Sequence, residues 1–438
     1  MTTSTHLVRS RRFLPLFVTQ LLGAFNDNLF KNAMVLFVVY NVYNSPAAEA
    51  KFSAIASALF IIPFFLLSAV AGQLADMRDK APIIRVVKFC EILIMLVGGA
   101  GLLLAWQGIA VSSFAIPLML AALFAMGVHS TFFGPIKYAI LPQHLHPQEV
   151  LAGTGLVEAG TYIAILSGTI LAGWIDVEYA AIGVVLTAVL GYFTGRQVPP
   201  APPQQAPEKL DFNVWRSSIS LVRNTTSDRR VFEAILAISF FWAVGTVLFI
   251  QFPPLAKNVL SASKEVASLF LVIFSIGVAI GSISINALLK GTVSARYAST
   301  SVLFMGFFVV CFYWVCHSWS YQPAAGLLDV SNFLAEPLAI PLLLSLLGIA
   351  VAGGMFVVPL YAFLTTFVDK SMTARTIAAN NIVNSGAMVV GSLVAGALSW
   401  VGIALTEQLL LSAVLCLVSA ALGRLLYKSE CAASAVIA

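Results

Sequence analysis

The chain carries few charged residues and few metal-binding or disulfide-forming ones. Only 10% of its 438 residues are Asp, Glu, Lys or Arg, whereas soluble domains carry about 25%. Its five cysteines are scattered and odd in number, which predicts neither a disulfide framework nor a metal site. The composition excludes a soluble enzyme, a secreted disulfide scaffold and a disordered protein.

Apolar residues make up 60% of the chain, and the mean hydropathy is +0.94. So much apolar surface requires a membrane, and runs long enough to cross a hydrocarbon core of about 30 Å recur from end to end. The sequence predicts an all-α membrane protein with twelve transmembrane helices in two six-helix bundles. The expected spans are 13–43, 52–75, 83–106, 113–138, 150–174, 179–195, 231–256, 266–289, 297–318, 336–366, 376–401 and 404–427.

One long polar segment, 196–230, separates the first six spans from the last six, and its beginning is rich in proline. It predicts an N-terminal bundle over 1–195, a cytoplasmic linker over 196–230 and a C-terminal bundle over 231–438. Within this linker, 215–222 is expected to form a helix on the membrane surface.

Basic residues predict the orientation of the chain in the membrane. When both termini and the linker are placed in the cytoplasm, most of the 24 Lys and Arg residues fall on the cytoplasmic side. Lys88 is counted there, in the basic group around the connection between the second and third spans. The positive-inside rule therefore favours a multi-pass protein with both termini in the cytoplasm.

The two halves of the chain share short sequence patterns. Tyr138–Leu141 recurs as Tyr361–Leu364, and Gly168–Gly173 recurs as Gly391–Gly396. Each pair falls in corresponding spans, the fourth and tenth or the fifth and eleventh. This correspondence indicates a fold built from duplicated six-helix units.

The connection after the second span, 72–80, reads G-Q-L-A-D-M-R-D-K. It resembles the G-x-x-x-D-[RK]-x-G-[RK] loop of the major facilitator superfamily, although Met77 replaces a base and Asp79 replaces a glycine. The resemblance implies a transporter whose Asp76 pairs with neighbouring helix ends in one conformation of the transport cycle. The alternative is that these charges only cap two helices at the surface. The residues of this expected switch loop are Gly72, Asp76, Arg78 and Lys80.

The first span contains a dense polar cluster formed by Asn26, Asp27, Asn28 and Lys31. Polar groups in the hydrocarbon region are costly, so they should face the bundle interior or a water-filled cavity. Asp27 lies near the expected bilayer midplane, and its i,i+4 spacing to Lys31 permits an ion pair. The cluster predicts substrate binding or ion coupling, and the alternative is an internal salt bridge that tethers helices.

Further polar residues lie in the fourth and fifth spans. Lys137 and Tyr138 lie close to the cytoplasmic end of the fourth span, where Lys137 could contact a phosphate or simply snorkel to the surface. Glu158 lies about ten residues into its span, deep enough to be a candidate proton or cation site. Glu91 and His129 also lie inside spans and are expected to pair with neighbouring helices.

In the second half, polar residues gather at the beginning of the eleventh span. They combine three amides at i, i+1 and i+4 with a cation at the mouth of the span. Such a group could contribute to a binding site, and the alternative is that the amides hydrogen-bond helices together. The residues are Arg375, Asn380, Asn381 and Asn384.

Three motifs narrow the resemblance: A-F-x-D-N at 24–28, P-x-K-Y-x-I-L at 135–141 and G-L-x-E at 155–158. Together they resemble the lysophospholipid transporter family, most of all the transporter module that some bacteria fuse to a 2-acylglycerophosphoethanolamine acyltransferase. Members of that family move lysophospholipids from the outer to the inner leaflet of the bacterial inner membrane, where these lipids are reacylated.

The resemblance covers the whole chain and implies roles for particular residues. At the fifth span the family usually has Asn before the Gly-Leu pair, whereas this chain has Thr154, so the headgroup contact there is not defined. The implied partners are a lysophospholipid substrate, membrane lipids and a separate acyltransferase, with no nucleic acid. The residues to which the resemblance assigns roles are Asp27, Asn28, Lys137, Tyr138 and Glu158.

Motifs of nucleotide binding and acyl transfer are missing from the sequence. It contains no G-x-x-x-x-G-K-[ST] loop and no H-x-x-x-x-D motif, so we expect a secondary transporter rather than an enzyme. No cofactor is expected, and coupling to protons or sodium stays open. Two alternatives remain: a major facilitator transporter of a small soluble metabolite or drug, and a membrane scaffold for an acyltransferase.

Overall fold

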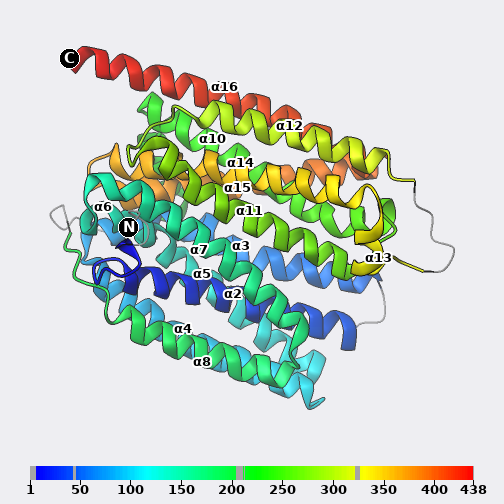
Figure 1. Cartoon of the computed structure of the whole chain (residues 1–438). Coiled ribbons are helices and arrows are strands. Elements are labelled where there is room, and N and C mark those ends of the chain that lie inside the picture. Colours follow the sequence, from blue (N-terminus) through cyan, green and yellow to red (C-terminus); the bar gives the residue numbers. More distant parts are fainter. Residues whose placement is uncertain (1–5, 43–45, 204–210, 212, 321–325, 438) are drawn as a thin grey trace. The chain divides into compact units, whose positions relative to one another are not determined.

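The computed structural model describes residues 6–42, 46–203, 211, 213–320 and 326–437 (Figure 1). These residues form an all-α protein with twelve helices of nineteen residues or more. The long helices are α2 (Leu14–Asn41), α3 (Pro46–Met77), α4 (Lys80–Trp106), α5 (Ile116–Ala139), α7 (Pro147–Trp174), α8 (Val177–Gly195), α10 (Arg229–Pro254), α11 (Lys264–Leu289), α12 (Ala298–His317), α14 (Ala339–Thr366), α15 (Thr373–Trp400) and α16 (Leu405–Ile437). The shorter ones are α6 (Leu141–His144), α9 (Val214–Thr225), α13 (Val330–Ala335) and the π-helical turns η1 (Val111–Ala115) and η2 (Leu255–Val259).

Eleven of the long helices are apolar and long enough to cross a membrane. The twelfth, α2, has 28 residues and extends over about 42 Å. Its length suffices for a span, but polar residues at its centre interrupt its apolar sequence. The structure therefore confirms the predicted all-α fold with twelve long helices. The polar cluster explains why α2 is not among the eleven apolar ones.

The described part of the predicted linker contains α9, whose bounds of Val214–Thr225 include the expected 215–222, and the beginning of α10 at Arg229. Residues 204–210 and 212 of this linker lie outside the described residues. The helix has a strongly amphipathic sequence: Ser217, Ser218 and Leu221 are buried, whereas Trp215 and Ile219 are exposed.

Polar side chains define where several helices begin. Asp79 accepts a hydrogen bond from the backbone N–H of Ala81 at 2.9 Å and so caps the first turn of α4. Its Oδ1 also accepts from the N–H of Ala201 at 3.0 Å, which fixes the beginning of the linker beside α4. Likewise Asp228 accepts from the N–H of Arg230 at 2.8 Å and caps α10. Each cap satisfies a backbone donor that has no partner within its own helix.

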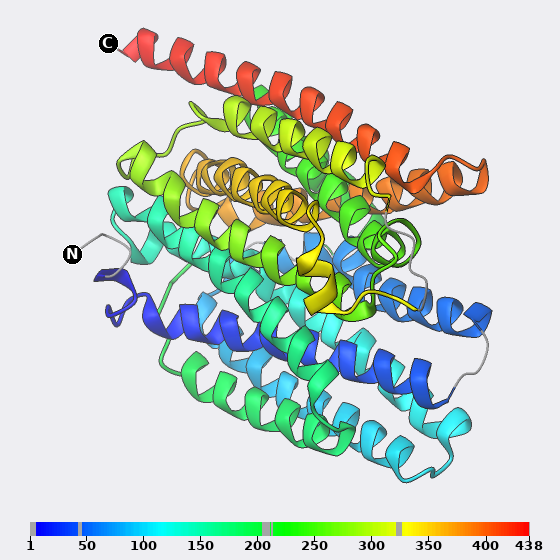
Figure 2. The same cartoon turned by 45° about the vertical axis from the view of Figure 1, so that its right-hand side comes forward.

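The chain divides into two compact units. The first comprises residues 1–153, 160–225 and 365–382, and the second comprises 154–159, 226–364 and 383–438. Within the first, α4 packs beside α8, and within the second, α12 packs beside α16 (Figures 1 and 2).

Each unit has its own apolar core. In the first, α2, α4 and α5 contribute large side chains that are fully buried: Phe30, Met34, Met95, Met119 and Leu123. In the second, aromatic rings from α10, α11, α12 and α13 pack edge to face. These rings belong to Phe252, Phe270, Phe274, Phe312 and Phe333.

Many large apolar side chains point outward from the long helices. Phe89 and Leu93 on α4, Leu186 and Leu190 on α8, and Phe307 on α12 are all about half exposed. A water-soluble protein does not expose apolar surface on this scale. The acyl chains of a lipid bilayer would cover these side chains.

Candidate functional site

The first unit contains an ion pair in its interior. Lys88 and Glu91, at i,i+3 on α4, approach to 2.7 Å between Nζ and Oε2. Their side chains are 0% and 1% exposed, so neither charge reaches solvent. Glu91 is eleven residues from the beginning of α4, or about 17 Å along a helix of about 40 Å. The pair therefore lies near the middle of a transmembrane helix.

Two neighbouring helices supply further partners for Glu91. Asn26 on α2 donates from Nδ2 to Glu91 Oε1 at 3.0 Å. On α5, His129 Nε2 lies 3.4 Å from Glu91 Oε2. The prediction that Glu91 and His129 pair with neighbouring helices is confirmed. Removing two charges from water is costly, and such a pair is tolerated only where additional hydrogen bonds satisfy the charged atoms.

The chain makes room for the buried ammonium group of Lys88 with a glycine and an aromatic ring. A Cβ at Gly23 on α2 would lie 2.5 Å from Lys88 Nζ, so a side chain there would collide with the ammonium. The Nζ atom also lies 5.0 Å from the centroid of the Phe133 ring, a cation–π distance. The placement of Lys88 in the cytoplasmic basic group is therefore wrong, because its position eight residues into α4 puts the side chain among three helices.

Asp27 extends this network toward the centre of α2. Ser130 donates from Oγ to Asp27 Oδ2 at 2.6 Å, and His129 Nδ1 lies 3.4 Å from the same Oγ. The other carboxylate oxygen, Asp27 Oδ1, is buried and has no hydrogen-bond partner among the residues that the structure describes. A buried carboxylate oxygen in this state can accept a hydrogen bond from a ligand or take a cation.

Lys31 and Asn28 share α2 with Asp27 but have different partners. Lys31 Nζ lies 5.8 Å from the centroid of the Phe60 ring. Within the described part of the chain, Lys31 forms no ion pair with Asp27, so the ion pair that their spacing permits is not made. Asn28 donates from Nδ2 to the carbonyl oxygen of Ala24 at 2.8 Å. The predicted polar cluster is thus present, with Asp27 and Lys31 available as separate charges.

The other residues predicted in the first half lie in two places. Lys137 is in the last turn of α5, and its Nζ lies 4.9 Å from the centroid of the Tyr138 ring, which is buried. Glu158 is on the part of α7 that belongs to the second unit, and only 2% of its surface is exposed. One turn earlier, Gly155 packs closely against the backbone of Ser282 on α11, which holds this part of α7.

The last turn of α3 contacts the beginning of another helix. Asp76, 1% exposed, accepts hydrogen bonds from the backbone N–H groups of Ala374 and Arg375, both at 2.9 Å. These are donors in the first turn of α15, where the helix dipole favours a negative charge. The guanidinium of Arg375 lies 4.0 Å from the same carboxylate. Asp76 therefore binds a helix end, as the resemblance of its loop implies.

The remaining residues of this loop differ in exposure. Lys80 is fully buried at the beginning of α4, where its backbone N–H donates to the carbonyl oxygen of Ala201 at 3.1 Å. Arg78 is exposed. Gly72, one turn before Asp76, lies against α15: a Cβ there would be 2.6 Å from Ala378 Cβ and 3.1 Å from the carbonyl oxygen of Ala374.

Gly72→Ala is therefore expected to lower the free energy of unfolding by about 1–3 kcal/mol, because the new methyl group meets backbone and Cβ atoms that cannot rotate away. The matched control is Gly183→Ala on α8, where the added Cβ would meet only Leu29 Cδ2 at 3.7 Å. That control should be neutral or slightly stabilising, since Ala favours a helix over Gly by about 1 kcal/mol. Thermal unfolding of both purified variants in detergent measures the difference. Equal melting temperatures would contradict the close α3–α15 contact.

The polar group predicted on α15 is divided between the two units. Asn380 is buried and Asn381 partly buried in the segment that belongs to the first unit. A Cβ at Gly134 on α5 would lie 3.4 Å from Asn381 Nδ2. Asn384 belongs to the second unit, where Ser239 Oγ donates to its Oδ1 at 2.7 Å.

A second hydrogen-bonded group surrounds Asn384. Its Nδ2 donates to the hydroxyl oxygen of Tyr361 on α14 at 3.3 Å, and Trp242 Nε1 on α10 donates to the same oxygen at 3.0 Å. Three helices of the second unit thus meet at one phenolic oxygen. Tyr361 is the residue that the sequence repeat pairs with Tyr138, and both tyrosines are buried.

Residues 16–347 match the sequence profile of the Major Facilitator Superfamily, which is well over half of the chain. The chain belongs to this family. It is a membrane transporter, as the twelve long helices and the Asp76 loop indicate.

Relatives of this major facilitator protein include transporters named for lysophospholipids. The chain is 26% identical over 392 residues to the lysophospholipid transporter LplT of Serratia proteamaculans, covering 87% of this chain and 86% of the relative. It is 24% identical over 399 residues to LplT of Cronobacter sakazakii, with 87% of each chain covered. These relatives confirm the predicted resemblance to lysophospholipid transporters, whereas the likeness to an acyltransferase-fused module stays a prediction.

Solved structures support the fold. The human organic anion transporter MFSD10 matches with a TM-score of 0.76 at 13% identity, covering 94% of this chain and 99% of that one. A bacterial homologue of the iron transporter ferroportin in an outward-facing state matches with a TM-score of 0.68 at 14% identity, covering 98% and 99%. Both likenesses establish the major facilitator fold.

Sequence reasoning missed the centre of the polar network in this major facilitator protein. Glu91 and His129 were expected only to pair with neighbouring helices, and Lys88 was counted in the basic group on the cytoplasmic side. The signal that could have found them is the i,i+3 spacing of a base and an acid inside one apolar span, Lys88 and Glu91, combined with a His in another span.

Proposed function

We propose that this chain moves lysophospholipids from the outer to the inner leaflet of the bacterial inner membrane by alternating access. The observation that carries the proposal is Asp27, an intramembrane carboxylate with one oxygen free of partners among the described residues, set in a polar network at the centre of α2. The likeness to lysophospholipid transporters over 87% of the chain supports the same substrate class.

The chemistry of a lysophospholipid fits the polar residues of the first unit. Such a lipid carries an anionic phosphate, a glycerol with a free hydroxyl and, in the ethanolamine form, an ammonium group. Asp27 Oδ1 can accept from the hydroxyl or the ammonium, while Lys31 can pair with the phosphate. Lys137 and Tyr138, in the last turn of α5, are a second candidate phosphate contact.

The contact between Asp76 and α15 supports an alternating-access cycle. Two charge-assisted hydrogen bonds of 2.9 Å hold the end of α3 to the first turn of α15. A transporter that exposes its site alternately to either side must break such contacts in one half of the cycle. Gly72, Asp76 and Arg375 are the residues through which this contact would switch, with Arg78 and Lys80 in the same loop.

The proposal also includes the orientation of the transporter in the membrane, the residues that could couple transport to an ion, and a partner enzyme. The distribution of basic residues favours both termini in the cytoplasm. Asp27 and Glu158 are the candidate sites for coupling to protons or sodium. A separate acyltransferase would consume the lipid that arrives in the inner leaflet.

Binding of the substrate can be tested by its effect on stability, since a ligand that binds the folded state raises the melting temperature. Purified protein should be stabilised by lysophosphatidylethanolamine below its micellar concentration, and less by glycerophosphoethanolamine, which lacks the acyl chain. Asp27→Asn should remove most of this shift, whereas Asn41→Ala, an exposed position on the same helix, should keep it. Equal shifts with glycerophosphoethanolamine would favour a soluble substrate and contradict the proposal.

A further inference from the structure

The helix α9 presents two different faces. Its inner face packs on α3, and Leu221 belongs to one buried apolar cluster with Ala69 of α3 and with Ala378 and Ala379 of α15. Ser217 accepts a hydrogen bond from the side-chain amide of Gln73 on α3. The Oε1 atom of the same Gln73 accepts from the backbone N–H of Asp211 at 3.1 Å, just before the helix begins. These contacts hold α9 along the end of α3.

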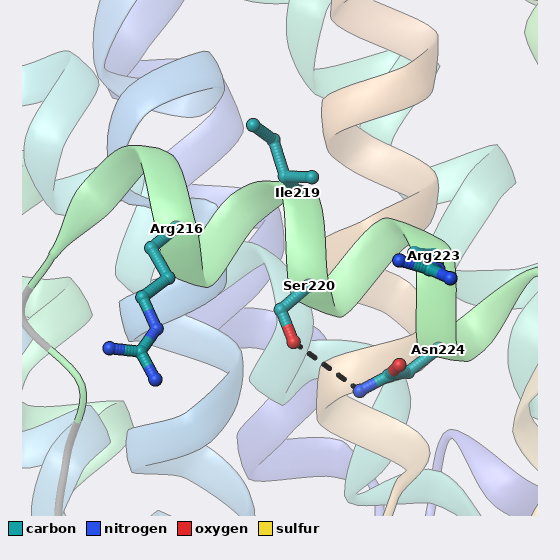
Figure 3. A pocket seen from close by; sticks show the side chains of 5 residues that line it. All are labelled: Arg216, Ile219, Ser220, Arg223 and Asn224. Carbon is teal, nitrogen blue, oxygen red and sulfur yellow. Dashed lines mark hydrogen bonds between the residues drawn. The ribbon is translucent and has the colours of Figure 1, made fainter.

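The outer face of α9 combines basic and apolar side chains. Two arginines, Arg216 and Arg223, stand two turns apart, and the Arg216 side chain is 81% exposed. Its Nε atom lies 4.0 Å from Oδ2 of Asp211, whose side chain is itself 43% exposed. A hollow of about 560 Å³ lies along this face, lined by Arg216, Ile219, Ser220, Arg223 and Asn224. In Figure 3, Ile219 points to one side of the helix, and Arg216 points to the other.

The contacts of α9 with α3 also indicate its depth. Gln73 is four residues before the end of α3 and Phe65 is twelve, which is about 6 Å and 18 Å along the helix. The ring of Trp215 packs edge to face on Phe65, with centroids 6.0 Å apart. Trp215 and Phe65 are both exposed, and Phe65 lies inside the apolar span 55–77. Trp215 thus reaches toward the hydrocarbon region while Ser217 contacts α3 closer to its polar end.

We propose that the outer face of α9 binds an anionic phospholipid of the surrounding bilayer. Arg216 and Arg223 contact its phosphate, Ser220 and Asn224 add hydrogen bonds, and Trp215 and Ile219 lie against its glycerol and upper acyl chains. An interfacial helix combines basic and aromatic side chains in this way. The site is separate from the intramembrane polar network, and the proposal holds whether or not a lysophospholipid is transported.

The charged and apolar side chains of this face together favour an anionic lipid over other ligands. A soluble anion would engage the two arginines but leave Trp215 and Ile219 in water. A zwitterionic lipid would cover the apolar side chains but bring no net negative charge to the arginines. Only an anionic lipid both pairs its negative charge with the arginines and covers Trp215 and Ile219. Because Leu221 shares an apolar cluster with residues of α3 and α15, a bound lipid would also hold α9 beside the helices that carry the Asp76 contact.

The test is a titration of the purified full-length protein, in a neutral detergent, with fluorescent phosphatidylglycerol and, in parallel, fluorescent phosphatidylcholine. The double variant R216Q/R223Q should bind phosphatidylglycerol about thirtyfold more weakly, since each arginine near an anionic lipid contributes about fivefold. R216K/R223K keeps the charge and should bind within about threefold of wild type. W215S/I219S should also weaken binding, which a purely electrostatic site would not show.

The matched control is R9Q/R11Q, which removes two exposed arginines near the amino terminus and changes the net charge equally. This control should bind as wild type does. The proposal is overturned if R9Q/R11Q loses as much affinity as R216Q/R223Q, or if both lipids bind equally. Displacement of the phosphatidylglycerol by millimolar inorganic phosphate would also overturn it, because that result assigns the site to a soluble anion. Circular dichroism and gel filtration confirm that the compared variants are folded.

Discussion

Glu91→Ala is expected to lower the free energy of unfolding by about 3–5 kcal/mol, a large part of the stability of most proteins. The substitution leaves the Lys88 ammonium, whose side chain is 0% exposed, without its counter-charge at 2.7 Å. It also removes the acceptor of the Asn26 amide and the carboxylate beside His129. An uncompensated charge in the middle of a transmembrane helix is what makes the expected loss so large.

The double variant Lys88→Met, Glu91→Leu removes both charges of the ion pair together. Replacing both charges with apolar groups of similar size should be far less destabilising than Glu91→Ala, because no buried charge is left. Unfolding of wild type, Lys88→Met, Glu91→Leu and the double variant in a denaturing-detergent titration measures the coupling between the two positions. If the double variant loses as much stability as the sum of its single changes, the ion pair does not exist in the folded protein.

Asp27→Asn is expected to reduce the rate of lysophospholipid transport at least tenfold. The change preserves size and can keep the hydrogen bond from Ser130 Oγ, now 2.6 Å long, but it removes the negative charge. If Asp27 Oδ1 takes an ammonium, a hydroxyl or a coupled cation, that interaction is charge-assisted and loses roughly half its strength or more on neutralisation. Uptake into proteoliposomes, normalised to the amount of inserted protein, measures the effect.

Two variants make the Asp27 result specific. Ser130→Ala removes a hydrogen bond to the carboxylate but keeps its charge, so transport should fall by less than with Asp27→Asn. Asn41→Ala changes an exposed amide on the same helix and should leave the rate unchanged. Equal rates for wild type and Asp27→Asn would show that this carboxylate only supports the helix bundle.

Much of the fold could be predicted from the sequence, because hydrocarbon thickness sets helix length and charge interrupts the apolar runs. The spans at 83–106 and 150–174 correspond to α4 and α7, which extend only three residues further at their amino-terminal ends. The linker helix α9 includes the helix expected over 215–222. Likewise, the contact of Asp76 with a helix end follows from the loop that it occupies.

The candidate site was less predictable, because it depends on which helices are neighbours. Sequence spacing brings Asp27 and Lys31 to one face of α2, and the i,i+4 rule suggests that they pair. The fold instead places Ser130 beside Asp27 and the Phe60 ring beside Lys31. Lys88 was misplaced for a related reason, since closeness to a basic loop says nothing about the direction in which a side chain points.

The most direct measurement of the central claim is the inward movement of labelled lysophosphatidylethanolamine in proteoliposomes, compared with empty vesicles and with Asp27→Asn. Imposed proton and sodium gradients in the same assay reveal any coupling. We expect uptake that requires the protein, that exceeds uptake of diacyl phosphatidylethanolamine and that falls at least tenfold in Asp27→Asn. Uptake no faster than in empty vesicles would contradict lysophospholipid transport and leave a major facilitator protein with a different substrate.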